Sequence, residues 1–251
     1  MSSVALKPHE TLILFIRHAE TRLNAIGGML QGGDSDGPLN QLNEEGKKQA
    51  EQLGLTLTKI FPKIASLYAA DLGRARETAE ILSYHYPHLK GRVTLDPCFR
   101  EVRHGPQEGM VGAEWRSRAK EVFEKKQQEA RARGEIVSRE FLYETPPFEG
   151  EETPKDAAAR MVKGALEGAR SNPGQVIAIV TSGAALNCFK IAIGTPKTEP
   201  KKHYNEIKSL PNCGIGAFVY SKEATTPEDS FKELGTVDLA SSTLEGIKFK
   251  Q

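Results

Sequence analysis

An arginine and a histidine lie together where the first apolar segment of the chain ends. Residues 11–17 form a continuous apolar run that closes with Arg17, and His18 follows it directly. Such a run is typical of a strand buried on both faces of a parallel sheet. Open α/β sheets bind ligands beyond the carboxyl ends of their strands, so Arg17 and His18 are candidates for a ligand site. Taken alone, the pair could equally cap the strand and form a surface ion pair.

Further polar features indicate that the ligand is an anion. Asn24 lies in the same loop as His18, and the run Gln31-Gly32-Gly33 could bring backbone close to a bound group. Arg74 is predicted at the start of a helix, where its planar guanidinium and the helix N-terminus would both attract an anion. Together these residues favour a phosphate site.

A carboxylate that could act on a phosphate ester lies in residues 99–105, a segment rich in turn-forming and polar residues. In a dry phosphate pocket, Glu101 could donate a proton to a leaving oxygen. Without the arginine and histidine nearby, it would be an ordinary glutamate.

The elements that must position these residues alternate between strands and helices. The sequence predicts strands at residues 11–17, 65–69, 175–181 and 214–220, and helices at residues 40–60, 73–84 and 184–193. Asn43 is the predicted N-cap of the first of these helices. This order predicts an α/β protein with a mostly parallel sheet covered by helices.

Two segments differ from this alternation. Residues 115–143 are dense in Lys, Arg and Glu, which favours a solvated helix face; the alternative is a lid whose basic residues reach a polyanionic substrate. Residues 221–251 are polar with few apolar side chains, and we expect a partly ordered C-terminal extension. We therefore expect one α/β domain over residues 1–220, with an insert at about 115–145, followed by that extension.

Composition excludes several classes of protein. The 251 residues include 34 Lys and Arg and 33 Asp and Glu, a formal net charge of +1, with 38% hydrophobic residues. This balance argues against a binder of nucleic acid or of anionic membranes, which would be strongly basic. Cys98, Cys188 and Cys213 fit neither a disulfide framework nor a zinc site. No segment resembles a signal peptide or a membrane span, so we expect a reducing, cytoplasmic location.

The motifs occur in an order that resembles the histidine phosphatase superfamily, also called phosphoglycerate mutase-like. The matching landmarks are residues 14–24, 71–79 and 100–101, then Gly105, residues 108–109, Gly150-Glu151-Glu152-Thr153 with Arg160, residues 176–181 and residues 210–214. Within the superfamily, the basic insert and the Thr145-Pro146-Pro147 turn are similar to the fructose-2,6-bisphosphatase (TIGAR-like) branch of broad-specificity phosphatases. The resemblance implies a three-layer α/β/α sandwich with a helical lid insert.

The resemblance also implies a metal-independent phosphatase without a cofactor, acting on a small phosphorylated substrate or binding inorganic phosphate. His18 would attack phosphorus and become a phosphohistidine, Glu101 would protonate the leaving alcohol, and water would then release phosphate. Arg17, Asn24 and Arg74 would hold the phosphoryl oxygens, because phosphoryl transfer depends mainly on positioning and charge stabilisation.

The chain departs from the family pattern after its late strand. The family carries a second histidine there, usually in a Ser-His-Gly run, whereas this chain has Ser182 before Gly183. A hydroxyl can still bind phosphate, but without charge assistance. Losing one preorganised donor typically lowers the rate by about 10²–10³-fold. His104 and His203 are candidates to supply the missing imidazole.

Three functions follow from these observations. The favoured one is a phosphomonoesterase that acts through a phosphohistidine. Ser182 motivates the second, a pseudophosphatase that binds a phosphoryl ligand or a protein partner without turnover. The third is a mutase or a scaffold repurposed for other chemistry, for which residues 115–143 could form a closing lid.

Overall fold

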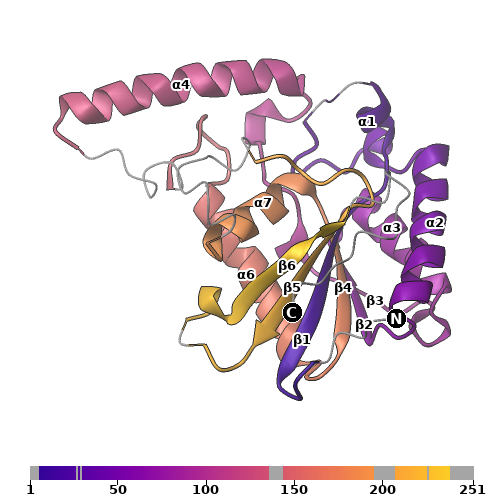
Figure 1. Cartoon of the computed structure of the whole chain (residues 1–251). Coiled ribbons are helices and arrows are strands. Elements are labelled where there is room, and N and C mark those ends of the chain that lie inside the picture. Colours follow the sequence, from indigo (N-terminus) through magenta and orange to yellow (C-terminus); the bar gives the residue numbers. More distant parts are fainter. Residues whose placement is uncertain are drawn as a thin grey trace.

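A six-stranded sheet runs through the computed structural model in the order β3-β2-β4-β1-β5-β6 (Figure 1). The structure describes residues 6–26, 28, 30–135, 144–194, 207–224 and 226–237. The strands are β1 (Glu10–Arg17), β2 (Ser66–Ala69), β3 (Val93–Leu95), β4 (Val176–Thr181), β5 (Ile215–Ser221) and β6 (Phe231–Val237). The α-helices are α1 (Arg22–Ile26), α2 (Glu44–Ile60), α3 (Gly73–Tyr84), α4 (Gly112–Ala132), α6 (Pro154–Arg170) and α7 (Gly183–Ala192). Short 3-10 helices cover Pro38–Asn40, Pro87–Leu89, Pro97–Phe99, Gly105–Gln107 and Glu228–Ser230.

β1 is an interior strand, as its apolar run predicts. It pairs in parallel with β4 and antiparallel with β5, and Leu12 to Ile16 are fully buried on both faces. β2 is parallel to both β3 and β4, whereas β6 is antiparallel to β5. The four strands β3, β2, β4 and β1 are therefore mutually parallel, and the pairings of β5 with β1 and with β6 are antiparallel.

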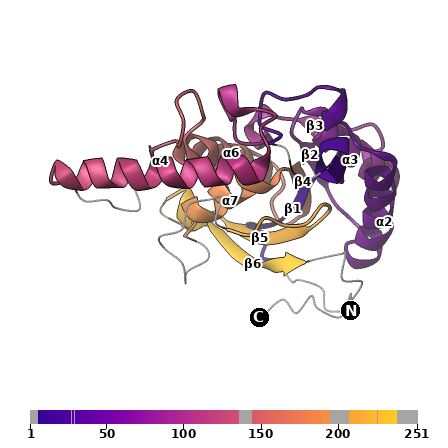
Figure 2. The same cartoon turned by 90° about the horizontal axis from the view of Figure 1, so that it is seen from above.

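Helices cover both faces of the sheet (Figures 1 and 2). On one face, Leu57 of α2 and Leu82 of α3 surround the same apolar space as Leu67 of β2. On the other face, Phe189 of α7 packs against Phe15 of β1, with ring centroids 4.8 Å apart, and α6 lies beside α7. The expected three-layer α/β/α sandwich is confirmed.

The first turn of α2 is fixed against the loop that follows β1. Asn43 caps the helix as predicted, because its side chain accepts a hydrogen bond from the Gly46 amide at 2.7 Å. A Cβ atom on Gly46 would lie 2.0 Å from the carbonyl oxygen of Glu20. Only glycine allows this approach, so α2 directly supports the segment that contains His18.

The segment after β5 differs from the expected polar extension. β6 adds a strand to the sheet through its pairing with β5. Its apolar residues explain this, because Phe231 is buried in the main core and Leu234 packs against it. Residues 238–251 lie outside the described part of the chain.

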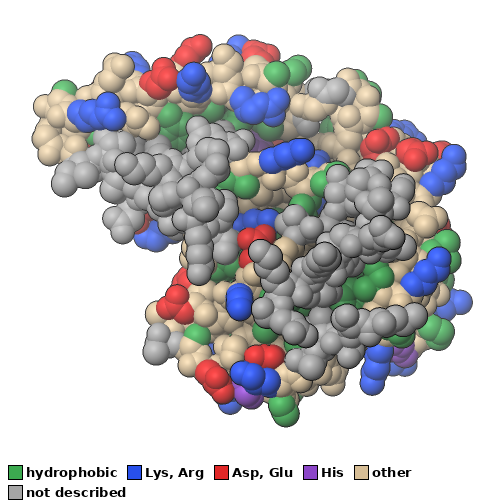
Figure 3. Space-filling view, in the orientation of Figure 1, with side chains coloured by type: hydrophobic (Ala, Val, Ile, Leu, Met, Phe, Trp, Pro, Cys, Tyr) green, Lys and Arg blue, Asp and Glu red, His purple; other side chains and the backbone are tan. Residues whose placement is uncertain are grey.

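α4 accounts for the described part of the charged insert and is helical as expected; residues 136–143 lie outside the description. Its first turns pack on the body through Trp115 and Ala119, and the helix then continues along the outside (Figures 1 and 2). Basic and acidic side chains alternate on its outer side (Figure 3), and Arg118 pairs with Glu114 one turn away. Most of α4 is therefore a solvated charged face. Within the described residues, no helix combines the length and apolarity needed to span a bilayer.

Candidate active site

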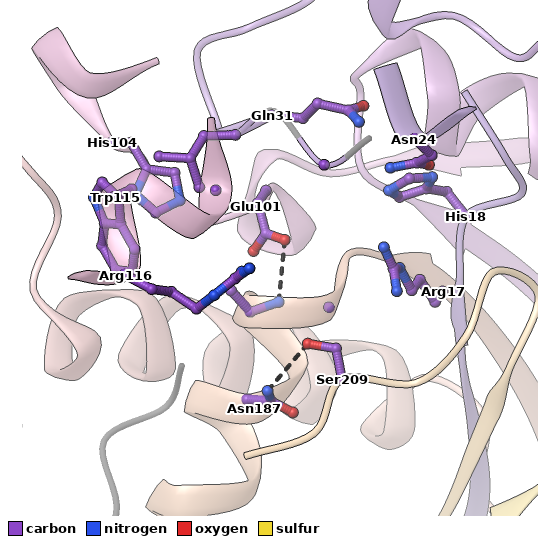
Figure 4. A pocket seen from close by; sticks show the side chains of 15 residues that line it. Arg17, His18, Asn24, Gln31, Glu101, His104, Trp115, Arg116, Asn187 and Ser209 are labelled. Carbon is purple, nitrogen blue, oxygen red and sulfur yellow. Dashed lines mark hydrogen bonds between the residues drawn. The ribbon is translucent and has the colours of Figure 1, made fainter. Parts of the chain in front are cut away.

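A cavity of about 230 Å³ opens beyond the carboxyl end of β1, where the ligand site was expected (Figure 4). Seven residues were proposed from sequence for catalysis or phosphate binding, and five of them line it, namely Arg17, His18, Asn24, Glu101 and Gly183. The other two, Arg74 and Ser182, do not line the cavity and are buried, with exposed fractions of 0% and 1%.

The imidazole of His18 has one defined tautomer. Its Nδ1 lies 2.8 Å from the carbonyl oxygen of Ala19, which can only accept a hydrogen bond. Nδ1 therefore carries the proton of the neutral ring, and Nε2 keeps its lone pair. Burial, and then the positive charges of Arg74 and Arg17, hold the pKa of His18 well below its ordinary value. The ring is thus neutral at physiological pH, with Nε2 available as a nucleophile.

Two guanidinium groups lie beside His18 and are held by backbone carbonyls. Nη1 of Arg17 donates to the carbonyl of Leu210, and Nη2 of Arg74 donates to the carbonyls of Gln31 and Gly32 at 3.0 and 3.1 Å. The Nε atoms of both arginines are buried and have no hydrogen-bond partner among the described residues. Each therefore keeps one unused donor.

Asn24 divides its amide between the protein and the cavity. Its Oδ1 accepts hydrogen bonds from the Thr21 amide and from the side chain of Asn212. These contacts leave its Nδ2 as the donor that a cavity ligand would meet.

Gly32 and Gly33 were expected to bring backbone close to a bound anion, but in the structure they pack against other parts of the protein. Gly33 donates from its amide to the carbonyl of Val102, and Gly32 donates to the carboxylate of Glu108 at 2.8 Å. A Cβ on Gly33 would lie 2.4 Å from the carbonyl oxygen of Glu101. The glycines allow close packing against the segment that carries Glu101, and only Gln31 of the run lines the cavity.

Glu101 is held at the N-terminus of α7. Its Oε1 accepts hydrogen bonds from the amides of Val102 and Ala185 at 2.8 and 2.6 Å, and its Oε2 accepts one from Ala184 at 3.1 Å. The side chain is therefore fixed at the wall of the cavity.

Ser182 occupies the N-cap position of α7 but makes no capping hydrogen bond. Its hydroxyl is buried without a partner in the described part of the structure. The next residue, Gly183, lines the cavity, where a Cβ would lie 2.9 Å from the hydroxyl of Ser209. His203, one candidate for the missing imidazole, lies outside the described residues.

His104, the other candidate, lines the cavity on a side that the sequence did not indicate. Figure 4 shows His104, Trp115 and Arg116 on one side of the cavity and Arg17, His18 and Asn24 on the other, with Glu101 between them. The basic composition of the insert hinted at Arg116. Asn187 and Ser209 also line the cavity, and no sequence signal marks them.

No three His, Cys, Asp or Glu side chains among the described residues converge as a metal site would require. Cys98, Cys188 and Cys213 are free thiols, and the last two are buried, as expected of small apolar residues.

Known proteins resemble this chain in sequence and in structure. A family model described as histidine phosphatase superfamily (branch 1) matches residues 13–229. Phosphoglycerate mutase-like protein 4 of Arabidopsis thaliana is 35% identical over 102 residues, which are 39% of this chain and 40% of that protein. The metal-independent phosphoserine phosphatase of the same plant is 27% identical over 190 residues, which are 76% of this chain and 71% of that protein.

Among solved structures, a phosphoglycerate mutase from Bacillus anthracis str. Sterne matches with a TM-score of 0.65. It covers 93% of this chain and 95% of its own, at 20% identity, and so shows a shared fold. The chain spans about two fifths of the length of several curated relatives that it matches.

Proposed function

Because the chain belongs to branch 1 of the histidine phosphatase superfamily, we propose that it hydrolyses small phosphomonoesters through a phosphohistidine. One observation carries the proposal. Arg17 lines the cavity beside His18, and its buried Nε has no hydrogen-bond partner among the described residues. Such an atom is rare in native proteins and costs about 1–3 kcal/mol, and an oxygen of a phosphoryl group would satisfy it.

In the first step, Nε2 of His18 attacks phosphorus while the bond from phosphorus to the ester oxygen breaks. Glu101, in its protonated form, gives its proton to the leaving oxygen, and the alcohol departs. In the second step, Glu101 takes a proton from water, the resulting hydroxide displaces His18 from phosphorus, and inorganic phosphate is released. Arg17, Arg74, Asn24 and the amide of Gly183 stabilise the charge on the transferring group.

The size and charge of the cavity favour a small substrate. About 230 Å³ accommodates a metabolite, and Arg116 adds a positive charge on the side opposite His18. Phosphoserine, named for the Arabidopsis phosphatase, has the phosphate and the carboxylate that this arrangement suits. The protein would belong to the TIGAR-like branch of broad-specificity phosphatases and would act in the cytoplasm, as the sequence predicts.

Ser182 favours a second candidate, a pseudophosphatase that binds phosphoryl ligands without turnover. Its neutral hydroxyl stands where the family has a cationic donor. We expect this replacement to lower the rate of phosphoryl transfer more than it lowers the affinity for phosphate.

The initial rate of phosphate release from p-nitrophenyl phosphate, phosphoserine and 3-phosphoglycerate tests the proposal. We expect the parent chain to be active, His18→Ala to lose about 10³-fold or more, and Ser182→His to gain about 10²-fold. His85→Ala is the matched control, because His85 pairs with Glu51 away from the cavity.

A silent parent whose activity appears in Ser182→His would support the pseudophosphatase instead. Silence in all four proteins would contradict phosphatase chemistry altogether. The phosphohistidine itself is checked with a ³²P-labelled ester, since the label on His18 should be stable in alkali and lost in acid.

A further inference from the structure

The cavity wall beside Gly183 carries a hydroxyl that the proposed reaction does not use. Ser209 lines the cavity, and a Cβ atom on Gly183 would lie 2.9 Å from its Oγ. The same Cβ position lies 3.7 Å from Nε of Arg17, the buried donor that has no hydrogen-bond partner among the described residues. The hydroxyl of Ser209 and the unused donor of Arg17 therefore border the same small region beside the Gly183 backbone.

The hydrogen bonds of Ser209 leave its proton for the cavity. Nδ2 of Asn187 donates to the carbonyl of Ile207 at 2.9 Å, and because a carbonyl only accepts, this contact identifies the nitrogen of the amide. The same nitrogen lies 3.3 Å from Oγ of Ser209, so that oxygen accepts a hydrogen bond from it (Figure 4). Within the part of the chain that the structure describes, Ser209 donates to no other group. Its own proton is therefore available to a molecule in the cavity.

The segment that carries Ser209 is tied to the two residues that begin the phosphate site. The carbonyl of Leu210 accepts a hydrogen bond from Nη1 of Arg17, and Nδ2 of Asn212 donates to the carbonyl of His18 at 2.9 Å. These contacts hold Ser209 on the side of the cavity where His18 would carry the phosphoryl group. The hydroxyl is thus in place before a ligand binds, which is the condition under which a donor best stabilises a transition state.

The imidazole that the family pattern places at position 182 has no counterpart at that position. Ser182 is 1% exposed and does not line the cavity, so its hydroxyl is out of contact with a ligand there. His104 lies across the cavity from Arg17 (Figure 4), and its Nδ1 is 3.2 Å from Oε1 of Glu151. Ser209, by contrast, borders the region next to the unused Nε of Arg17.

We propose that Ser209 is a further catalytic residue: its hydroxyl donates a hydrogen bond to a phosphoryl oxygen and takes over part of the role of the family's second histidine. The hydroxyl keeps its proton, and the phosphoryl group passes from the ester oxygen to His18 and then to water. A donor fixed beside the phosphoryl oxygens stabilises the charge that they carry in the transition state. This inference rests on the proposed phosphatase function, because that function places the phosphoryl group at His18.

The first experiment removes the hydroxyl with Ser209→Ala and measures phosphate release from p-nitrophenyl phosphate, phosphoserine and 3-phosphoglycerate. A hydrogen bond to a charged group is worth about 10- to 100-fold. We expect kcat/KM to fall by about that factor for all three esters, because the phosphoryl group is what they share. Ser171→Ala is the matched control, since its hydroxyl donates to the Glu167 carbonyl outside the cavity. A loss confined to one ester, or no loss, would overturn the proposal.

The second experiment makes the same change in Ser182→His, where the introduced imidazole supplies a donor. Ser209→Ala should then lower kcat/KM by less than about threefold, because the two donors serve the same group. This result would also show that the chain folds without the Ser209 hydroxyl. An equal loss in both backgrounds would mean that Ser209 does not stand in for the imidazole, and it would overturn the proposal.

A failure of the proposed phosphatase function gives a different result. The parent chain would then release no phosphate from any of the three esters. Calorimetric titration of inorganic phosphate into the parent and Ser209→Ala would still measure the contact, and we expect Kd to rise by about 10-fold in the variant. An unchanged Kd would overturn the role of Ser209.

Discussion

Burial is the main reason that the pKa of His18 is lowered, and the positive charges of Arg74 and Arg17 lower it further. The carbonyl of Ala19 sets the tautomer of the neutral ring. The same two arginines would attract a phosphoryl group. One pair of charges can therefore both keep the nucleophile free of its proton and bring it a substrate.

NMR titration of the histidine ring protons checks the state of His18. Because the folded pKa of His18 is depressed, its signal should stay at the neutral position as pH falls from about 8 through the ordinary imidazole range near 6.5. In that range the unfolded chain binds the proton first, so this contribution to stability is lost as pH falls. His18→Asn assigns the signal, and a normal titration of that signal would contradict the arrangement.

Many residues of the site could be predicted from the sequence, and those that could not were missed for physical reasons. Arg17, His18 and Asn24 follow one strand, so the rule of strand ends brings them together. Arg74 was predicted to bind an anion because it lies at the start of a helix. In the structure its guanidinium is buried against the backbone carbonyls of residues 31–35. His104 and Glu151 are 47 residues apart, and no local spacing reveals such a contact.

At the scale of elements, α6 fixes the segment that carries Glu101. The guanidinium of Arg160 donates to the carbonyls of Cys98, Arg100 and Glu101 and pairs with the buried carboxylate of Glu152. α6 therefore positions a residue of the cavity without contributing a side chain to it.

Removing this arginine should unfold the protein more readily. Arg160→Met leaves Glu152 buried without its cation, and we expect a loss of about 3–5 kcal/mol in the free energy of unfolding by urea. Glu152→Gln in the same chain should restore part of that loss. Arg170→Met, at the other end of α6, is the control and should change stability by less than about 1 kcal/mol. Equal losses of stability in Arg160→Met and Arg170→Met would contradict this role of Arg160.

Element prediction succeeded where patterns are strong. The expected helix at residues 73–84 coincides with α3, and the apolar runs became β1 and β4. α6 was not predicted, although Thr153 caps it and Pro154 begins it, which is a recognisable helix start. β3 and β6 are short or polar, and their strand character comes from pairing with a neighbour.

For the whole molecule, the unused Nε donor of Arg17 at the cavity predicts stabilisation by inorganic phosphate. A ligand at 100 times its Kd adds about 2.7 kcal/mol, which corresponds to a rise in Tm of about 5–10 °C for a chain of this size. Differential scanning calorimetry in phosphate and in chloride at equal ionic strength measures the rise. Arg17→Gln should abolish it. An equal shift in that variant would mean that phosphate acts as a general salt rather than at the cavity.

The position of β1 in the sheet has a consequence for synthesis of the chain. β1 is complete at Arg17, but its neighbours β4 and β5 end at Thr181 and Ser221. At about 5–20 residues per second, a ribosome needs roughly 8–33 s to make the chain between Arg17 and the end of β4. During that time the apolar residues of β1 have no neighbouring strand to pair with. The nascent chain should therefore need protection from aggregation until β4 and β5 have been made, and fragments that stop before β4 should not fold.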